Sequence, residues 1–261
     1  MKGIKTKIGD QFIQIIYEPT VLFNSFLRNF QPNVGSENDQ ADLIIKIKEG
    51  YGVPFVDYKV DIIEDHNQIL YRRADYLIEV NSTFKYATIS VHDELALKHA
   101  MMNLYSSFIV HHNWGLLIHS SCVIEKGKVH IFAGQSGAGK STAAKLSYPR
   151  TLLSDEATLV KITQNQITVF NSPFRSEIET DDFKGSLDAA SVQILYQALQ
   201  NNRVKLTRSD ALLQLMDKVF FWPRSPEEIK TIMRLLTMLV KNVPVFELYF
   251  QKNNTFWELI S

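Results

Sequence analysis

Short alternating runs of apolar and polar residues dominate the first ninety positions of this chain. Five of them have the period of two that is typical of strands with one buried face, at 12–17, 41–48, 69–72, 76–80 and 86–91. Clusters of Asn, Gly, Pro and Asp separate the runs, as expected of turns. The pattern therefore predicts a β-rich N-terminal domain over residues 1–92.

The period changes at Asp93, after which apolar residues recur at helical intervals as far as His111. Asp93 can cap the first turn, so we predict a helix within a connecting segment of residues 93–113. Further helices are predicted at 190–200, 209–219 and 227–239, and strands at 115–124, 129–133, 151–153, 157–162, 167–170 and 243–250. This mixture indicates an α/β domain over residues 114–261.

Within that domain, residues 134–142 read Gly-Gln-Ser-Gly-Ala-Gly-Lys-Ser-Thr, a full match to the phosphate-binding pattern G-x-x-x-x-G-K-[ST]. The glycines let backbone N–H groups turn toward a triphosphate, while Lys140 reaches the outer phosphates and the Ser141 hydroxyl binds Mg²⁺. A β-prone run precedes the loop and a helix-forming run follows it, which favours an anion site over a chance glycine turn. The residues expected to bind ATP are Gly134, Ser136, Gly137, Ala138, Gly139, Lys140, Ser141 and Thr142.

An acidic pair, Asp155 and Glu156, follows the predicted strand 151–153 directly. The segment between this strand and the phosphate loop is long enough for a right-handed β-α-β crossover. Such a crossover brings the carboxyl ends of both strands to one sheet edge, beside Lys140. There one carboxylate could hold Mg²⁺ and the other could take a proton from an attacking hydroxyl. The alternative for the pair is a solvated loop or a helix cap.

Three other side chains are weaker candidates. His119 lies on the predicted strand pair that leads to the loop, although a single histidine more often serves a structural role. Arg175 and Glu177 follow Pro173 in an irregular segment, where they could contact phosphate or a partner, or form a surface ion pair.

Composition narrows the classes of function. Lys+Arg and Asp+Glu both total 28, so net charge gives no reason to expect nucleic acid or an anionic membrane as partner. A single cysteine, Cys122, excludes an internal disulfide and a Cys-rich zinc site. No apolar run reaches the length of about 18 residues that predicts a membrane span. The N-terminus lacks the apolar region of a signal peptide, so we expect a cytoplasmic protein.

Together, these motifs resemble the HPr kinase/phosphorylase family and, beyond it, the phosphoenolpyruvate carboxykinase-type nucleotide fold. The resemblance covers about residues 114–260 and rests on the segments 119–123, 134–142, 152–156 and 171–177. It implies a P-loop nucleotide-binding core with a smaller β-rich N-terminal domain. It also implies that Lys140 and Ser141 bind ATP and Mg²⁺, that Asp155 activates an acceptor serine, that Glu156 helps to hold the metal, and that His119 lies near the phosphates.

Departures from that family point to a particular branch. This chain has Asp155-Glu156 where the bifunctional enzyme usually has two aspartates, and the segment that contacts HPr is not found. The chain is more similar to the divergent HPr-kinase-like proteins that phosphorylate a serine, typically the C-terminal one, of lasso-peptide precursors. The predicted function is therefore an ATP-dependent serine kinase of a peptide or small protein. The resemblance also implies homo-oligomers, which related enzymes form. The alternatives are a non-catalytic nucleotide-binding scaffold, an HPr(Ser) kinase regulator and, least favoured, an ATPase motor or transporter subunit.

Overall fold

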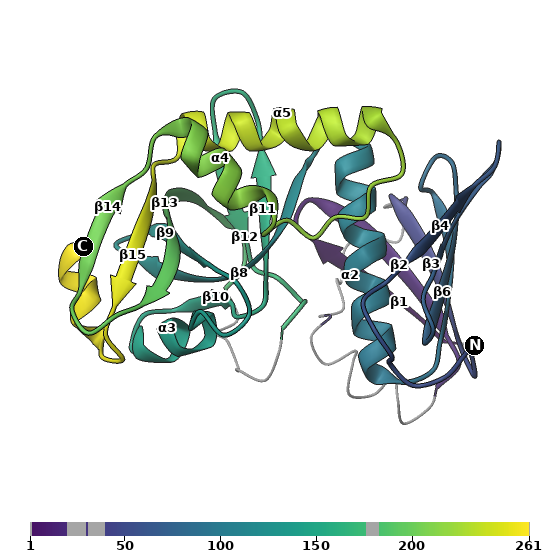
Figure 1. Cartoon of the computed structure of the whole chain (residues 1–261). Coiled ribbons are helices and arrows are strands. Elements are labelled where there is room, and N and C mark those ends of the chain that lie inside the picture. The colour runs from purple at the N-terminus through teal and green to yellow at the C-terminus, as the bar shows by residue number, and fades with distance from the viewer. Residues whose placement is uncertain (1, 20–29, 31–39, 176–182, 261) are drawn as a thin grey trace. The chain divides into compact units, whose positions relative to one another are not determined.

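The computed structural model describes residues 2–19, 30, 40–175 and 183–260 (Figure 1). Its contacts divide the chain into two compact units. Residues 1–111 and 221–226 form the N-terminal unit, and residues 112–220 and 227–261 form the C-terminal unit. The helix that we predicted as a connector thus belongs to the N-terminal unit, which also includes a short segment from much later in the chain.

A seven-stranded sheet in the order β1-β2-β3-β7-β6-β5-β4 forms most of the N-terminal unit. Its strands are β1 (Lys2–Ile8), β2 (Gln11–Tyr17), β3 (Leu43–Glu49), β4 (Asp61–Glu64), β5 (Gln68–Arg72), β6 (Tyr76–Asn81) and β7 (Tyr86–Val91). The parallel pairs are β2–β3 and β3–β7, and the other neighbours are antiparallel. The alternating pattern correctly predicted β2, β3, β5, β6 and β7, but it missed the two edge strands, β1 and β4.

One face of this sheet is covered by α2 (Glu94–His111), which packs against β6 and β7. Asp93 caps the helix as predicted, because its Oδ1 accepts a hydrogen bond from the backbone N–H of Ala96 at 2.9 Å. Buried polar groups fix the helix to the sheet. The Tyr105 hydroxyl donates to the Ile8 carbonyl at 2.8 Å, and the Asn103 amide donates to the Tyr76 hydroxyl at 3.1 Å.

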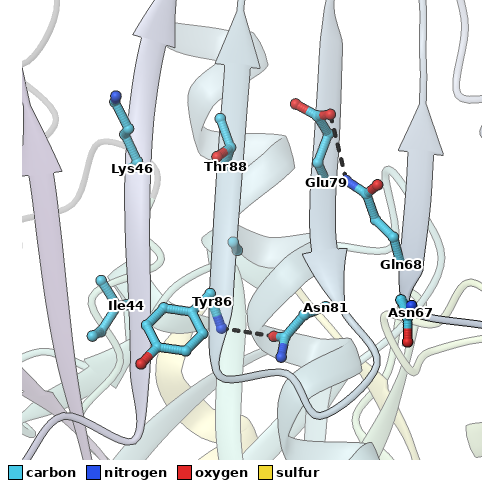
Figure 2. Close-up of a pocket in the computed structure, with 9 residues that line it drawn as sticks. Ile44, Lys46, Asn67, Gln68, Glu79, Asn81, Tyr86 and Thr88 are labelled. Atoms are coloured by element: carbon cyan, nitrogen blue, oxygen red, sulfur yellow. Dashed lines mark hydrogen bonds between the residues drawn. The ribbon is translucent and has the colours of Figure 1, made fainter.

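The opposite face of the sheet carries a shallow hollow of about 450 Å³ (Figure 2). Side chains from β3, β5, β6 and β7 line it, among them Lys46, Glu79 and Thr88. The Gln68 side-chain amide on β5 donates to Oε1 of Glu79 on the neighbouring strand β6 at 3.5 Å. Because polar and apolar side chains mix here, this face differs from the apolar face beneath α2.

The C-terminal unit contains an eight-stranded sheet and the remaining helices. Its strands are β8 (Gly115–Glu125), β9 (Lys128–Ala133), β10 (Leu152–Ser154), β11 (Ala157–Ile162), β12 (Ile167–Phe170), β13 (Ser186–Gln197), β14 (Asn202–Lys205) and β15 (Val245–Phe250). Its helices are α3 (Lys140–Leu146), α4 (Arg208–Met216), α5 (Pro226–Asn242) and the 3₁₀ helix η2 (Asn254–Leu259). The pairings β8–β11–β12–β13–β9–β8 close a five-stranded barrel, and β10, β14 and β15 extend it.

One prediction in this unit was wrong, since residues 190–200 belong largely to strand β13 and not to a helix. β13 runs parallel to both β9 and β15 over Val192–Ile194, so residues 191–195 are buried on both faces. Such a strand lacks the alternation that identifies a half-buried strand, and its apolar run is hard to distinguish from a buried helix.

Candidate functional site

The phosphate-loop motif lies at a strand-to-helix junction, as predicted. β9 ends at Ala133, the loop spans residues 134–139, and α3 begins at Lys140. Gly137 and Gly139 have φ angles of 79° and 105°, a backbone region that residues with a side chain rarely adopt. The Lys140 ammonium is buried and donates to the carbonyls of Gly134 and Gln135 at 3.0 and 3.1 Å. The lysine side chain thus folds back onto the start of the loop.

Close packing also restricts this loop to glycine at two positions. A Cβ on Gly134 would lie 2.8 Å from the Cβ of Ala138, and one on Gly139 would lie 2.8 Å from Cζ of Phe250. Gly134 thus lies close to Ala138 within the loop. Gly139 lies close to Phe250, which belongs to an apolar cluster that also includes Phe256.

Strand β8 lies at the centre of the candidate site. It pairs with β9, which leads into the phosphate loop, and with β10, which leads into the acidic pair. β9 ends opposite Ser120, and β10 ends opposite Cys122. Both β9 and β10 are antiparallel to β8, so they share one direction and their carboxyl ends lie at the same edge. The Ser121 hydroxyl donates to the carbonyl of Lys140 at 3.1 Å. The expected neighbourhood of the loop and the acidic pair is thus present, with β8 between the two strands.

The acidic pair is a two-residue break between strands rather than a loop beyond a strand end. β10 ends at Ser154 and β11 begins at Ala157, and both pair with β8. At the break, the backbone N–H of Ser120 donates to the carbonyl of Glu156 at 3.1 Å. Glu156 is half-buried, whereas Asp155 is only 2% exposed.

The two carboxylates act on different neighbours. The pKa of Lys140 is lowered by burial and by the charge of Lys218, whereas the negative charge of Glu156 raises it. Asp155 instead influences Cys122, whose pKa is raised to about 12 mainly by burial, with the nearby Asp155 charge adding to the effect. Glu156 is therefore the acidic residue whose charge reaches Lys140, while Asp155 lies deeper, near a protonated thiol.

His119 lies beside these groups on β8. Its backbone N–H donates to the carbonyl of Lys218 at 2.6 Å, and its ring packs on Phe220 with centroids 5.3 Å apart. Burial, followed by the positive charges of Lys140 and Lys218, lowers the pKa of His119 to about 4. The imidazole is consequently neutral near pH 7 and can donate or accept one hydrogen bond.

A cleft of about 550 Å³ opens next to the phosphate loop. It is lined by residues 134–138 of the loop, residues 194–197 at the end of β13, and Leu213, Gln214, Asp217 and Lys218 in and after α4. His119 and the acidic pair are not among its lining residues. Lys218 was missed at the sequence level because a single lysine after a helix matches no motif.

Arg175, another candidate, is not among the residues that line this cleft. The guanidinium of Arg175 is held by its own loop, where it donates to the Ser172 carbonyl at 2.9 Å and to the Asn171 side chain at 2.6 Å. Glu177 lies outside the described residues. A role for Arg175 in binding phosphate therefore stays a prediction.

The side-chain oxygens of Ser141 and Glu156 are of the kind that Mg²⁺ prefers as ligands. Across the described ranges, no cluster of three or more His, Cys, Asp or Glu side chains could hold a metal ion. Mg²⁺ usually takes only one or two protein ligands and completes its shell with phosphate oxygens and water. The exposed Ser141 hydroxyl and the Glu156 carboxylate could supply such ligands beside Lys140.

Fold and site together define a mixed α/β protein that carries a phosphate-loop motif at the edge of a five-stranded barrel. A family model described as SynChlorMet cassette protein ScmC matches residues 85–261, about two thirds of the chain. The chain belongs to this family. No curated protein matches it. Within the described part of the chain, no helix has both the length and the apolar character needed to cross a membrane.

Proposed function

We propose that this protein is an ATP-dependent serine kinase that phosphorylates a peptide or small protein. One observation carries the proposal: residues 119–121 of β8 connect the phosphate loop with the acidic pair. The Ser121 hydroxyl donates to the backbone carbonyl of Lys140, and the backbone N–H of Ser120 donates to the backbone carbonyl of Glu156. A hydroxyl that is to be phosphorylated needs a charge-stabilising lysine and a carboxylate near one another, and this arrangement supplies both.

In the proposed reaction, the acceptor Oγ attacks the γ-phosphorus of ATP. A bond between them forms as the bond from γ-phosphorus to the β–γ bridging oxygen breaks, and ADP leaves with that electron pair. The Asp155 carboxylate takes the hydroxyl proton, and Lys140 stabilises the negative charge on the phosphates. Ser141 and Glu156 would hold Mg²⁺, which would supply further charge neutralisation when bound. Neutral His119 offers a hydrogen bond to the same phosphates.

The nucleotide would enter through the phosphate-loop cleft, whose volume lies within the usual range for small-molecule sites. The acceptor is less defined. The sequence resemblance suggests a serine at the C-terminus of a precursor peptide, while the family description speaks of a cassette and names no reaction. Peptides encoded beside this protein are therefore the first substrates to test.

The direct test is to incubate the protein with Mg²⁺, ATP and serine-containing peptides, and to measure a mass gain of one phosphate. Asp155→Asn should reduce the rate by about 10²–10⁴-fold, the usual contribution of a general base. Glu156→Gln should raise the Mg²⁺ concentration needed for half-maximal rate. If Glu156→Gln removes the rate and Asp155→Asn leaves it unchanged, the two carboxylates have the reverse roles.

Matched controls exist for both kinds of change. Asp188 is an exposed carboxylate near the start of β13, whereas the cleft is lined by the end of that strand. Lys145 is an exposed lysine on α3, the same helix as Lys140. Asp188→Asn and Lys145→Met should both retain full activity, whereas Lys140→Met should lose it. If ATP binds but no serine peptide is phosphorylated, the kinase proposal fails and a nucleotide-binding scaffold is favoured.

A further inference from the structure

Lys218 is a buried lysine that takes no part in the reaction described above. It is only 4% exposed, although its own sequence neighbour Asp217 is largely exposed. Backbone contacts hold it against β8. Its carbonyl accepts the hydrogen bond from His119, and the next residue, Val219, forms a β-bridge with Ile118. Lys218 is thereby fixed beside the part of β8 that also contacts the phosphate loop.

Lys218 also lines the phosphate-loop cleft, on the side formed by the end of α4. The Lys140 ammonium donates to the carbonyls of Gly134 and Gln135, two residues that line the same cleft as Lys218. The charge of Lys218 accordingly lowers the pKa of Lys140. Like charges that are partly removed from water destabilise each other unless an anion lies between or beside them. A ligand with several negative charges, such as a polyphosphate, would remove this repulsion.

The ion pair of Lys218 provides a way to accept such a ligand. Its Nζ contacts Asp217 Oδ1, and the side chain of Asp217 is 58% exposed while that of Lys218 is 5% exposed. An exposed carboxylate is readily hydrated when its partner leaves, but a buried ammonium needs a counter-charge. Exchange of the Asp217 carboxylate for a phosphate oxygen therefore satisfies both side chains.

We propose that Lys218 is a second phosphate-binding cation, which leaves Asp217 and binds the nucleotide phosphates from the α4 side of the cleft. Lys140 binds them from the loop side. This inference rests on the proposed nucleotide binding and adds a residue that the phosphate-loop motif does not contain. Asp217 is then the counter-ion of Lys218 before the nucleotide binds.

The proposal predicts opposite effects for the two members of the ion pair. Lys218→Gln should weaken ATP binding by about 10–100-fold, because a hydrogen bond from a charged group is lost. Asp217→Asn should strengthen ATP binding, because the competing carboxylate is removed. If the pair had only a structural role, both substitutions would disrupt the same contact and would weaken binding alike.

The experiment is calorimetric titration of the full chain with MgATP, alongside Lys140→Met and the control Lys145→Gln. Thermal melting of each variant without nucleotide shows whether it is folded. If Lys218→Gln does not fold, Asp217→Asn decides alone, since unchanged or weaker binding overturns the proposal. Suppose that the wild type binds MgATP, with binding lost in Lys140→Met but kept in Lys218→Gln. That result overturns the role of Lys218 and leaves nucleotide binding in place. No binding by the wild type overturns nucleotide binding itself.

Discussion

At Gly139 in the phosphate loop, substitution by alanine should destabilise the protein for two separate structural reasons. Its φ of 105° is unfavourable for a residue with a side chain, and an added Cβ would lie 2.8 Å from Cζ of Phe250. Gly137 offers a matched comparison. Its φ of 79° is also positive, but a Cβ there would meet nothing within 4 Å. The two alanine variants therefore separate backbone strain from steric overlap.

The expected magnitudes follow from these two terms. Left-handed backbone costs about 1–2 kcal/mol for a residue with a Cβ, and this cost applies to both variants. Overpacking of a filled core adds about 1–3 kcal/mol, and this cost applies only to Gly139→Ala. Phe250 cannot swing away freely, because it is 3% exposed and packs on Phe256 with ring centroids 5.6 Å apart. Gly139→Ala should thus lower the free energy of unfolding by about 2–5 kcal/mol and Gly137→Ala by about 1–2 kcal/mol.

Urea unfolding monitored by circular dichroism would measure both variants, with Phe250→Leu as a third and the double variant Gly139→Ala/Phe250→Leu as a fourth. The smaller leucine should recover part of the loss in Gly139→Ala, so the double variant should be more stable than the sum of the single effects predicts. Equal destabilisation by Gly137→Ala and Gly139→Ala, with no recovery in the double variant, would refute the steric argument. It would also mean that the loop does not rest on Phe250.

Three further predictions concern stability. Asp75 accepts two hydrogen bonds from buried Arg73, at 2.6 and 2.9 Å. Asp75→Asn should therefore lower the free energy of unfolding by about 3–5 kcal/mol, measured by urea titration. A loss below about 1 kcal/mol would contradict this expectation. Burial lowers the pKa of His130 to about 4 from 6.5, so protonation favours the unfolded chain and stability should fall as the pH drops from about 6.5 toward 4. His130→Asn should flatten that dependence between pH 7 and pH 5, and an unchanged slope would count against it. The Thr207 side chain accepts a hydrogen bond from the N–H of Asp210 and caps α4, so Thr207→Ala should lower the melting temperature through a loss of about 1 kcal/mol, whereas Thr207→Ser should not.

The sequence predicted the features that depend on local pattern. The phosphate-loop motif is read from nine consecutive residues, and its position between β9 and α3 follows from the flanking propensities. Alternation identified the half-buried strands of the first sheet. β13 was missed because its centre is buried on both faces, and β1 was missed because its many lysines obscured the alternation.

Features that depend on contacts between distant residues were not predictable in the same way. Lys218 and His119 lie about a hundred residues apart in the sequence and are joined beside a single β-bridge, and no motif marks Lys218. The acidic pair was expected beside the phosphate loop from the crossover rule, and β9 and β10 do end at the same sheet edge, on either side of β8. Its position as a break between β10 and β11 could not be expected, because it depends on β8 pairing with both strands.

The division of the chain has a consequence for dissecting the protein. The chain passes from one compact unit to the other three times, after residues 111, 220 and 226. A fragment that begins at residue 112 would therefore contain the six residues 221–226 without the N-terminal unit to which they belong. The residues matched by the family model begin at 85, so they include β7 and α2 of the N-terminal unit together with the C-terminal unit. Activity should accordingly be assayed on the intact chain.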